Sequence, residues 1–305
     1  MRAPRVVLFF LDGVGIGTAD PDVNPLFRAH LPVLRSLLGG KLFHKGLKSI
    51  RTRRAQVKPV NATLGIAGLP QSGTGQTAIF TGVNAPKMIG RHYGPFPTTD
   101  LKPVIREENI FATLLQAGKR VVFANAFPRQ FFEFTNGGTR RLTVTTLSCM
   151  MSGVPLLTAG DLKANRGVSA DITRQRWPEM GYPDLPEIPA EQAGKHLADL
   201  SREHDFTLFE YWLTDHAGHS QNMKSCVDIM ERFDSFLGGF LARVDLKQTT
   251  VLLTSDHGNL EDITTKGHTR NPVPGLAFGR SAARVLAPIK NLTHITPGIV
   301  KLLTT

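Results

Sequence analysis

The chain has 305 residues, of which 41% are hydrophobic and 20% are charged. These values exclude an intrinsically disordered chain and provide enough apolar surface for one to three folded domains. Lys and Arg number 36 against 25 Asp and Glu, so the formal net charge is +11 and the pI is near 9.9. Such a surplus predicts an anionic partner: a nucleic acid, an acidic surface or a phosphorylated substrate.

The two cysteines, Cys149 and Cys226, are too few for a disulfide scaffold or a cysteine-rich zinc module. We expect them to be buried thiols in a reducing compartment, with the cytoplasm as the location. No apolar run approaches the roughly 18–20 residues of a membrane span, which predicts no membrane association. The apolar run of residues 6–11 is too short for a signal peptide and ends at Asp12, so it is expected to be a buried strand.

Strands and helices are predicted to alternate along the chain. Continuously apolar runs predict strands at residues 6–11, 121–126, 206–213 and 251–254. Helical stretches precede the last three of these strands, at residues 109–117, 190–203 and 227–244. A strand that is apolar on both faces is typical of a parallel sheet covered by helices on both sides. The pattern therefore predicts an α/β fold with a mainly parallel sheet sandwiched by helices.

The stretch of residues 129–189 differs from the rest in composition. It is rich in Gly, Pro, Thr and Arg, and its hydrophobic periodicity is weaker. We interpret it as a small inserted cap on a core formed by residues 1–128 and 190–305, with a set of long surface loops as the alternative. The aromatic run of residues 131–134 fits core packing of this cap better than the wall of a pocket.

Three aspartates come soon after predicted strands: Asp12, Asp215 and Asp256. Ligands of parallel α/β sheets bind at the carboxyl ends of the strands, so these carboxylates are expected to converge at one edge. His219 lies four residues after Asp215. If a helix begins there, both side chains share one face of it and can bind one metal ion.

Two further histidines extend this pattern. His257 directly follows Asp256 on a predicted tight turn, and His268 lies in a loop that Pro272 and Pro274 make rigid. Taken singly, each of these residues is more often a hydrogen-bonded core or surface residue than a metal ligand. Together with the aspartates, they predict a metal site at the carboxyl edge of the sheet.

A loop of small residues runs from residue 68 into a helical segment predicted at residues 77–81. Backbone N–H groups at the start of a helix stabilise an anion, and Ser72 or Thr74 would lie near that point. The alternative interpretation is an N-cap followed by a glycine-rich turn. The G-x-S-x-G pattern of a nucleophile elbow is absent, because Pro70 and Thr74 occupy its glycine positions.

Taken together, these motifs identify a resemblance to the alkaline phosphatase superfamily of binuclear metalloenzymes. The segments at residues 11–15 (LDGVG), 254–259 (TSDHGN) and 268–274 (HTRNPVP) are similar to the metal-binding segments of one branch of that superfamily. This branch contains cofactor-independent phosphoglycerate mutase and phosphopentomutase. The resemblance covers the N-terminal part up to about residue 90 and, roughly, residues 190–305, and the motifs occur in the family order.

The resemblance also implies a nucleophile and two metal sites. In this branch the nucleophilic Ser or Thr lies three residues before a glycine that opens a helix; Ser72 has this relation to Gly75, and Thr74 is the fallback. Direct contact with a metal ion lowers the pKa of a serine hydroxyl and activates it. The implied ligands are Asp215, His219 and His268 for one ion, and Asp12, Asp256, His257 and the Ser72 oxygen for the other. Such mixed carboxylate and imidazole ligands favour Mn²⁺ or Zn²⁺ over Mg²⁺.

Two departures from the mutases shape the predicted function. Their inserted domain is larger than residues 129–189, and a histidine follows their helix-opening glycine where this chain has Gln76. We therefore predict a phosphatase or phosphodiesterase that acts through a phosphoserine intermediate on Ser72. The alternative is a phosphomutase of a small phosphorylated metabolite. A second alternative, an anion-binding or nucleic-acid-binding protein, would exploit the charge but lacks a helix-turn-helix, RRM or KH signature.

The substrate is expected to be a small phosphorylated anion, which the surplus of Lys and Arg would steer toward the metal ions. Arg91 and His92 follow the nucleophile segment and are the first candidates for contacts with it, since arginine binds phosphate bidentately. Further arginines lie in the predicted cap: Arg140, Arg141, Arg166, Arg174 and Arg176.

Overall fold

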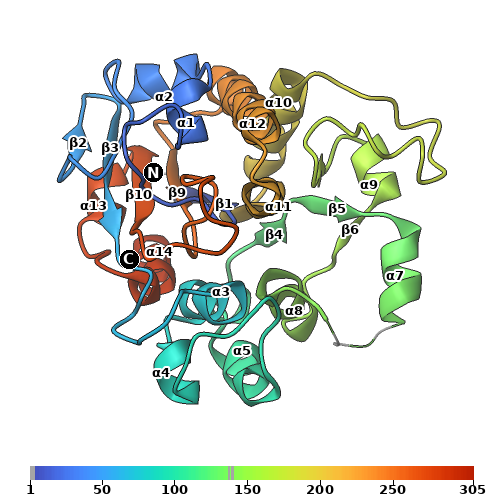
Figure 1. The fold of residues 1–305 in the computed structure, drawn as a ribbon. Coiled ribbons are helices and arrows are strands. Elements are labelled where there is room, and N and C mark those ends of the chain that lie inside the picture. Colours follow the sequence, from blue (N-terminus) through green and yellow to red (C-terminus); the bar gives the residue numbers. More distant parts are fainter. Residues whose placement is uncertain (1–3, 137, 139–140) are drawn as a thin grey trace.

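The computed structural model describes residues 4–136, 138 and 141–305, and it contains two sheets (Figure 1). The larger sheet is formed by β1 (Arg5–Leu11), β2 (Ile50–Arg51), β3 (Ala55–Val60), β4 (Val121–Phe123), β8 (Phe206–Tyr211), β9 (Thr249–Thr254) and β10 (Val273–Gly279). The smaller sheet is formed by β5 (Asn125–Phe127), β6 (Leu157–Thr158) and β7 (Val168–Ser169). The strand orders are β2-β3-β10-β9-β1-β8-β4 and β6-β5-β7.

Helices cover both faces of the larger sheet, and others lie beside the smaller sheet instead. In the N-terminal half they are α1 (Pro25–Arg28), α2 (Pro32–Leu37), α3 (Ser72–Thr81), α4 (Ala85–Ile89), the 3-10 helix η1 (Thr99–Leu101), α5 (Lys102–Glu108), α6 (Ile110–Gln116), α7 (Arg129–Thr135) and α8 (Val144–Met151). They continue with α9 (Ala159–Lys163), α10 (Ala190–Ser201), α11 (Leu213–Ser220), α12 (Met223–Arg243), α13 (Ala282–Leu286), the 3-10 helix η2 (Leu292–His294) and α14 (Ile295–Thr304). Of these helices, α7 and α9 lie beside the smaller sheet (Figure 1).

Strand β1 lies inside the larger sheet and pairs in parallel with β8 and β9. Its side chains alternate between the two faces, because successive residues of a strand point to opposite sides. Phe9 packs with α10 and α12 on one face, where it meets Phe233 and Phe240 edge-on. Phe10 packs on the other face against Phe80 of α3, with α8 and α14 nearby (Figure 1). The predicted α/β fold, with helices on both faces of the sheet, is confirmed.

One edge of the larger sheet is antiparallel, which the sequence did not indicate. Strand β10 pairs antiparallel with both β9 and β3. The predicted strand at 206–213 ends at Tyr211, because Leu213 already begins α11. The helix predicted at residues 77–81 begins earlier, at Ser72.

The predicted strand at residues 121–126 is divided between the two sheets. It pairs with β8 only as far as Phe123, and from Asn125 onward the chain belongs to the smaller sheet. Within the predicted cap, 129–189, helix α8 packs with the core side chains of α3 and α6. The smaller sheet, α7 and α9 stand apart from this layer, on the right of Figure 1. Residues 144–151 therefore pack with the core rather than with a separate cap.

Across the described residues, none of the helices is both long and apolar enough to cross a membrane. Cys149 and Cys226 are free and buried, as expected from the sequence.

Candidate metal centre

The loops after β1, β8 and β9 bring the three predicted aspartates to one edge of the larger sheet. The turn after β1 depends on Gly13, whose φ is +68°. A Cβ atom at Gly13 would lie 2.5 Å from Oδ1 of Asp215, so only glycine permits this approach. The backbone N–H of Gly13 lies 3.3 Å from Oδ1 of Asp256 and donates to it. One tight turn thus connects all three loops.

Asp215, His219 and His268 form a first cluster of candidate ligands. Nε2 of His219 lies 3.2 Å from Oδ2 of Asp215 and 3.2 Å from Nε2 of His268. The Nδ1 atoms of both histidines face backbone carbonyl groups: that of Pro70 for His268, at 2.7 Å, and that of Lys266 for His219, at 2.8 Å. These contacts hold Nδ1 protonated and leave Nε2 as the free electron pair that a metal ion requires.

A second cluster gathers around His257. Its Nε2 atom lies 3.0 Å from Oγ of Ser72, 3.3 Å from Oδ1 of Asp12 and 3.6 Å from Oδ2 of Asp256. Asp215 joins this cluster, since one of its oxygens lies within 4.8 Å of ligand atoms of both Asp12 and His257. The side chain of Asp215 therefore stands between the two clusters.

The electrostatics of this edge fit bound cations. Oδ1 of Asp12 and Oδ2 of Asp256 are buried and have no hydrogen-bond partner among the described residues. Burial and the charge of Asp256 raise the pKa of Asp12 well above its usual range, and burial also raises the pKa of Asp256. Burial disfavours the charged form of His257, but Asp256 and Asp12 outweigh it and raise its pKa to about 10. Divalent cations would stabilise these carboxylates in place of that proton.

Ser72 and Thr74 take different roles at the start of α3. The Ser72 hydroxyl faces His257, whereas the Thr74 hydroxyl donates to the carbonyl of Gln71 and accepts from the N–H of Tyr93. The N–H of Thr74 donates to the carbonyl of Tyr93, so this amide is not available to an anion. A Cβ atom at Gly75 would lie 3.0 Å from the backbone oxygen of Asp256, which explains a glycine where the helix meets that loop.

Sequence reasoning missed Glu261, which is fully buried below the site. Its Oε2 accepts from the N–H groups of Gly15 and Asn259, both at 2.8 Å. Its Oε1 accepts from the Thr269 hydroxyl and the Asn271 amide. Glu261 thus ties the loop after β1 to two parts of the connection between β9 and β10, one at Asn259 and one beside His268. The one feature of the sequence that could have indicated a role for Glu261 is that it lies five residues after the predicted ligand Asp256.

Asn259 and Gln76 also contact candidate ligands, although no role was predicted for either. Nδ2 of Asn259 donates to Oδ1 of Asp215 at 2.7 Å. Nε2 of Gln76 donates to Oδ2 of Asp12 at 3.1 Å. The residue that departs from the mutase pattern therefore orients a candidate metal ligand.

The residues predicted to contact the substrate, Arg91 and His92, are not brought together with the candidate metal ligands. Arg91 is exposed and stacks over the ring of Tyr93, 5.4 Å from its centroid. His92 is half-buried, and burial lowers its pKa. No contact of either residue with Ser72 or the candidate ligands is found among the described residues. Among the cap arginines, Arg174 is buried against the Leu162 carbonyl, Arg166 pairs with Asp161, and Arg140 lies outside the described residues.

The sequence profile of the metalloenzyme superfamily matches residues 4–305. A 2,3-bisphosphoglycerate-independent phosphoglycerate mutase from Pyrococcus abyssi is 32% identical over 85 residues, which are 28% of this chain and 20% of that protein. The chain thus spans about a fifth of the length of this curated relative.

Two solved structures share the fold over nearly the whole chain. Alkaline phosphatase from the Antarctic bacterium TAB5 matches with a TM-score of 0.57 and 14% identity, covering 99% of this chain and 98% of that one. Phosphoglycerate mutase from Leishmania mexicana matches with a TM-score of 0.59 and 11% identity, covering 100% and 96%.

Proposed function

Since this chain belongs to the metalloenzyme superfamily, we propose that it is a metal-dependent phosphatase or phosphodiesterase that acts through a phosphoserine intermediate on Ser72. The observation that carries the proposal is the convergence of the Ser72 hydroxyl with His257 and Asp12, at the edge where Asp215 and Asp256 also end. Phosphoryl transfer mainly requires positioning and charge neutralisation, and this edge offers both.

Two divalent ions, Mn²⁺ or Zn²⁺, are part of the proposal. One would be held by Asp215, His219 and His268, and the other by Asp12, Asp256 and His257 together with Ser72. When bound, such ions supply the positive charge that stabilises the oxygens of a transferring phosphoryl group and lowers the pKa of a nearby hydroxyl. Gln76 and Asn259 orient ligand carboxylates, and Glu261 fixes the loops that carry them.

In the proposed reaction, the Ser72 hydroxyl gives up its proton, and its Oγ forms a bond to phosphorus while the bond from phosphorus to the leaving oxygen breaks. The leaving oxygen takes up a proton. Water then adds to phosphorus and returns a proton to Oγ, which releases phosphate from a monoester substrate and a phosphate monoester from a diester substrate. A small phosphorylated substrate fits the net charge of +11. Two free, buried thiols support a reducing compartment, for which we propose the cytoplasm.

Phosphomutase activity is the second candidate, because the relative from Pyrococcus abyssi is named as a mutase. Gln76 favours the hydrolase, since the mutases that this chain resembles have a histidine there. The two activities differ in product: a phosphatase releases one phosphate per substrate, a phosphodiesterase releases an alcohol and a phosphate monoester, and a mutase returns an isomer with little free phosphate.

The test combines variants at Ser72 and Thr74. Metal-loaded protein is incubated with a panel of phosphate monoesters and diesters, and both phosphate release and isomerisation are measured. Ser72→Ala is expected to lose the acid-stable phosphoprotein and the activity, whereas Thr74→Ser is expected to keep both. Full activity of Ser72→Ala would contradict the assignment of the nucleophile.

A further inference from the structure

A cavity of about 400 Å³ opens where the two sheets part. Strand β4 leaves β8 after Phe123, and beyond this point a side chain takes the place of a strand: Nδ2 of Asn125 donates to the carbonyl of Glu210 at 2.7 Å, and the N–H of Glu210 donates to Oδ1 of Asn125 at 2.9 Å. The backbone of β8 is thereby satisfied without a neighbouring strand, which leaves space beside it. The sheet can therefore open into a cavity here while both the N–H and the carbonyl of Glu210 keep a hydrogen-bond partner.

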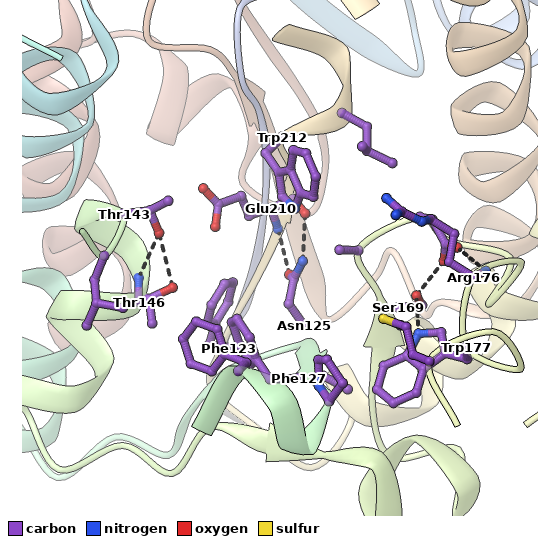
Figure 2. A pocket seen from close by; sticks show the side chains of 18 of the residues that line it. Phe123, Asn125, Phe127, Thr143, Thr146, Ser169, Arg176, Trp177, Glu210 and Trp212 are labelled. Carbon is purple, nitrogen blue, oxygen red and sulfur yellow. Dashed lines mark hydrogen bonds between the residues drawn. The ribbon is translucent and has the colours of Figure 1, made fainter. Parts of the chain in front are cut away.

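Five aromatic side chains line this cavity. They are Phe123, Phe127, Phe131, Trp177 and Trp212, and Figure 2 labels all of them except Phe131. The expectation that residues 131–134 pack in a core is wrong for Phe134, which is 69% exposed, whereas Phe131 packs against the core and also lines the cavity. An apolar cavity of about 150 Å³ is enough to bind benzene, so this one has room for one or two aromatic rings.

One buried polar group points to a ligand. Glu210 is 3% exposed, and no hydrogen bond of its Oε1 atom meets the distance and angle criteria among the described residues, although the Thr145 hydroxyl lies close enough to oppose the rise that burial causes in the pKa of Glu210. Figure 2 shows its carboxyl group between Trp212 and the pair Thr143 and Thr146, at the wall of the cavity. Burial raises the pKa of Glu210 to about 8, so the group is largely protonated at neutral pH and can donate a hydrogen bond. Because the Glu210 side chain lines the cavity, its carboxyl group offers a ligand there a polar partner.

The cavity adjoins the metal centre. Glu210 is the register partner of Phe10 on β1, and Asp12 lies two residues beyond Phe10. Leu213, which lines the cavity, is the first residue of α11, the helix that carries Asp215. A substrate with its phosphate at the metal centre would therefore extend its organic part toward this cavity.

We propose that the cavity takes the organic part of the substrate, and that this part is a flat aromatic group with a hydrogen-bonding atom that meets Glu210. Aromatic rings pack against one another edge-on or offset, and the walls offer such partners on several sides. The exposed Arg141 and Arg176, which also line the cavity, would attract the anionic substrate. The identification of the ligand as part of the substrate rests on the proposed function. The proposal that the cavity binds an aromatic group does not depend on that function.

The tryptophans provide a direct test. The chain has two, Trp177 and Trp212, and both line the cavity. Titration of the full chain with benzyl alcohol is expected to change the tryptophan fluorescence saturably. Cyclohexylmethanol, which has a similar size but no aromatic ring, is expected to bind about tenfold more weakly or less.

Two matched substitutions locate the binding site. Ala170 lines the cavity, so Ala170→Phe fills part of it and is expected to weaken benzyl alcohol binding at least about tenfold. Ala164 is exposed at the end of α9, and Ala164→Phe is expected to bind like the unmodified protein. Thermal melting checks folding, and if Ala170→Phe is unfolded, Ala170→Val serves as the smaller filling variant. Glu210→Gln is expected to weaken 4-hydroxybenzyl alcohol more than 4-methylbenzyl alcohol.

Equal binding of the aromatic and the saturated alcohol would overturn the proposed aromatic group, and equal weakening by both alanine substitutions would overturn the location. The titration needs no metal ion and no phosphorylated compound. Saturable binding without any phosphate release therefore contradicts the proposed function alone. Phosphate release without saturable binding contradicts this inference alone.

Discussion

The metal centre and the aromatic cavity lie beside one another at the carboxyl edge of the larger sheet, but they are built in different ways. The aspartates of the metal centre, Asp12, Asp215 and Asp256, all follow strands within four residues. The cavity is lined by side chains that the chain contributes between Phe123 and Leu213, from both sheets and several loops.

This difference teaches which part of a site the topology alone determines. Parallel strands end at one edge, so polar residues after those strands must meet, whatever the surrounding loops do. The cavity instead depends on where one strand leaves the sheet, which Asn125 makes possible through two side-chain hydrogen bonds. In the proposed function, the common sheet would position the groups that carry the chemistry, and the local departure from it would set the preference for the organic part of the substrate.

Removal of metal ions is the strongest way to separate the two regions. Chelation with EDTA, checked by mass spectrometry of bound metal, is expected to lower phosphate release more than about a hundredfold, because the charge that neutralises the transferring group is lost. Mn²⁺ or Zn²⁺ should restore it. The change in tryptophan fluorescence with benzyl alcohol is expected to persist in the chelated protein. Full hydrolysis by metal-free protein would contradict the proposed metal centre.

The support beneath the metal centre provides the second test. Glu261→Gln replaces a buried carboxyl group that accepts hydrogen bonds from the loop after β1 and from two parts of the connection between β9 and β10. Loss of such an outer-shell group lowers metal affinity by about 10-fold to 100-fold, which a calorimetric metal titration measures. Asp262→Asn is the matched control, because among the described residues the Asp262 carboxylate accepts side-chain hydrogen bonds only from Thr264, which lies in the same loop. Unchanged metal affinity in Glu261→Gln would show that the loops hold without it.

The parts of the molecule that sequence predicts well are those with repeated signals. The continuously apolar residues 6–11 predict a buried strand, which is β1. The spacing of four residues between Asp215 and His219 predicts that they share one face of a helix, which is α11. The buried strand, the helical layers and the meeting of the aspartates followed from such signals. The division of residues 121–126 between two sheets did not, because it depends on a tertiary contact of Asn125 with Glu210 that has no local sequence signature.

Glu261 and Glu210 show the same limit for single residues. Both are acidic, and acidic residues are usually exposed, so residue type alone gives no sign of their burial. Glu261 is buried because four donors from converging loops surround it. Glu210 is buried on strand β8, at the wall of the cavity.

The unusual state of Glu210 leads to a test of stability against pH. The pKa of Glu210 is raised by burial to about 8. An unfolded glutamate loses its proton near pH 4.3, so between that pH and about 8 the folded state holds a proton that the unfolded state lacks. The free energy of unfolding therefore falls as the pH rises through this window, by at most about 1.4 kcal/mol per pH unit from this group.

Glu210→Gln cannot titrate and should lack this contribution. Relative to that of the unmodified protein, its free energy of unfolding is expected to increase as the pH rises from about 5 to 8, because only the unmodified protein loses stability over this range; chemical denaturation at several pH values measures the difference. Glu179→Gln, at an exposed glutamate, serves as the control and should follow the unmodified protein. Parallel curves for all three proteins would mean that Glu210 is ionised in the folded state, and the cavity would then hold a charge rather than a neutral donor.

The smallest expected effect concerns Gln76, which links α3 to the metal centre. Gln76→Leu keeps a similar volume but removes the donor that lies 3.1 Å from Oδ2 of Asp12. A hydrogen bond to a carboxylate contributes about 1 kcal/mol or somewhat more, so kcat/KM for an aryl phosphate should fall about threefold to tenfold. Gln116→Leu, at an exposed position on α6, is the control.

The same pair of variants separates orientation of a ligand from contact with the substrate. If Gln76 acts through Asp12, then Gln76→Leu lowers metal affinity and the hydrolysis of benzyl and methyl phosphates by the same factor. A loss confined to benzyl phosphate would instead mean that Gln76 contacts the organic group of the substrate. Helix α3 would then contribute to the binding of that group in addition to the residues that line the cavity.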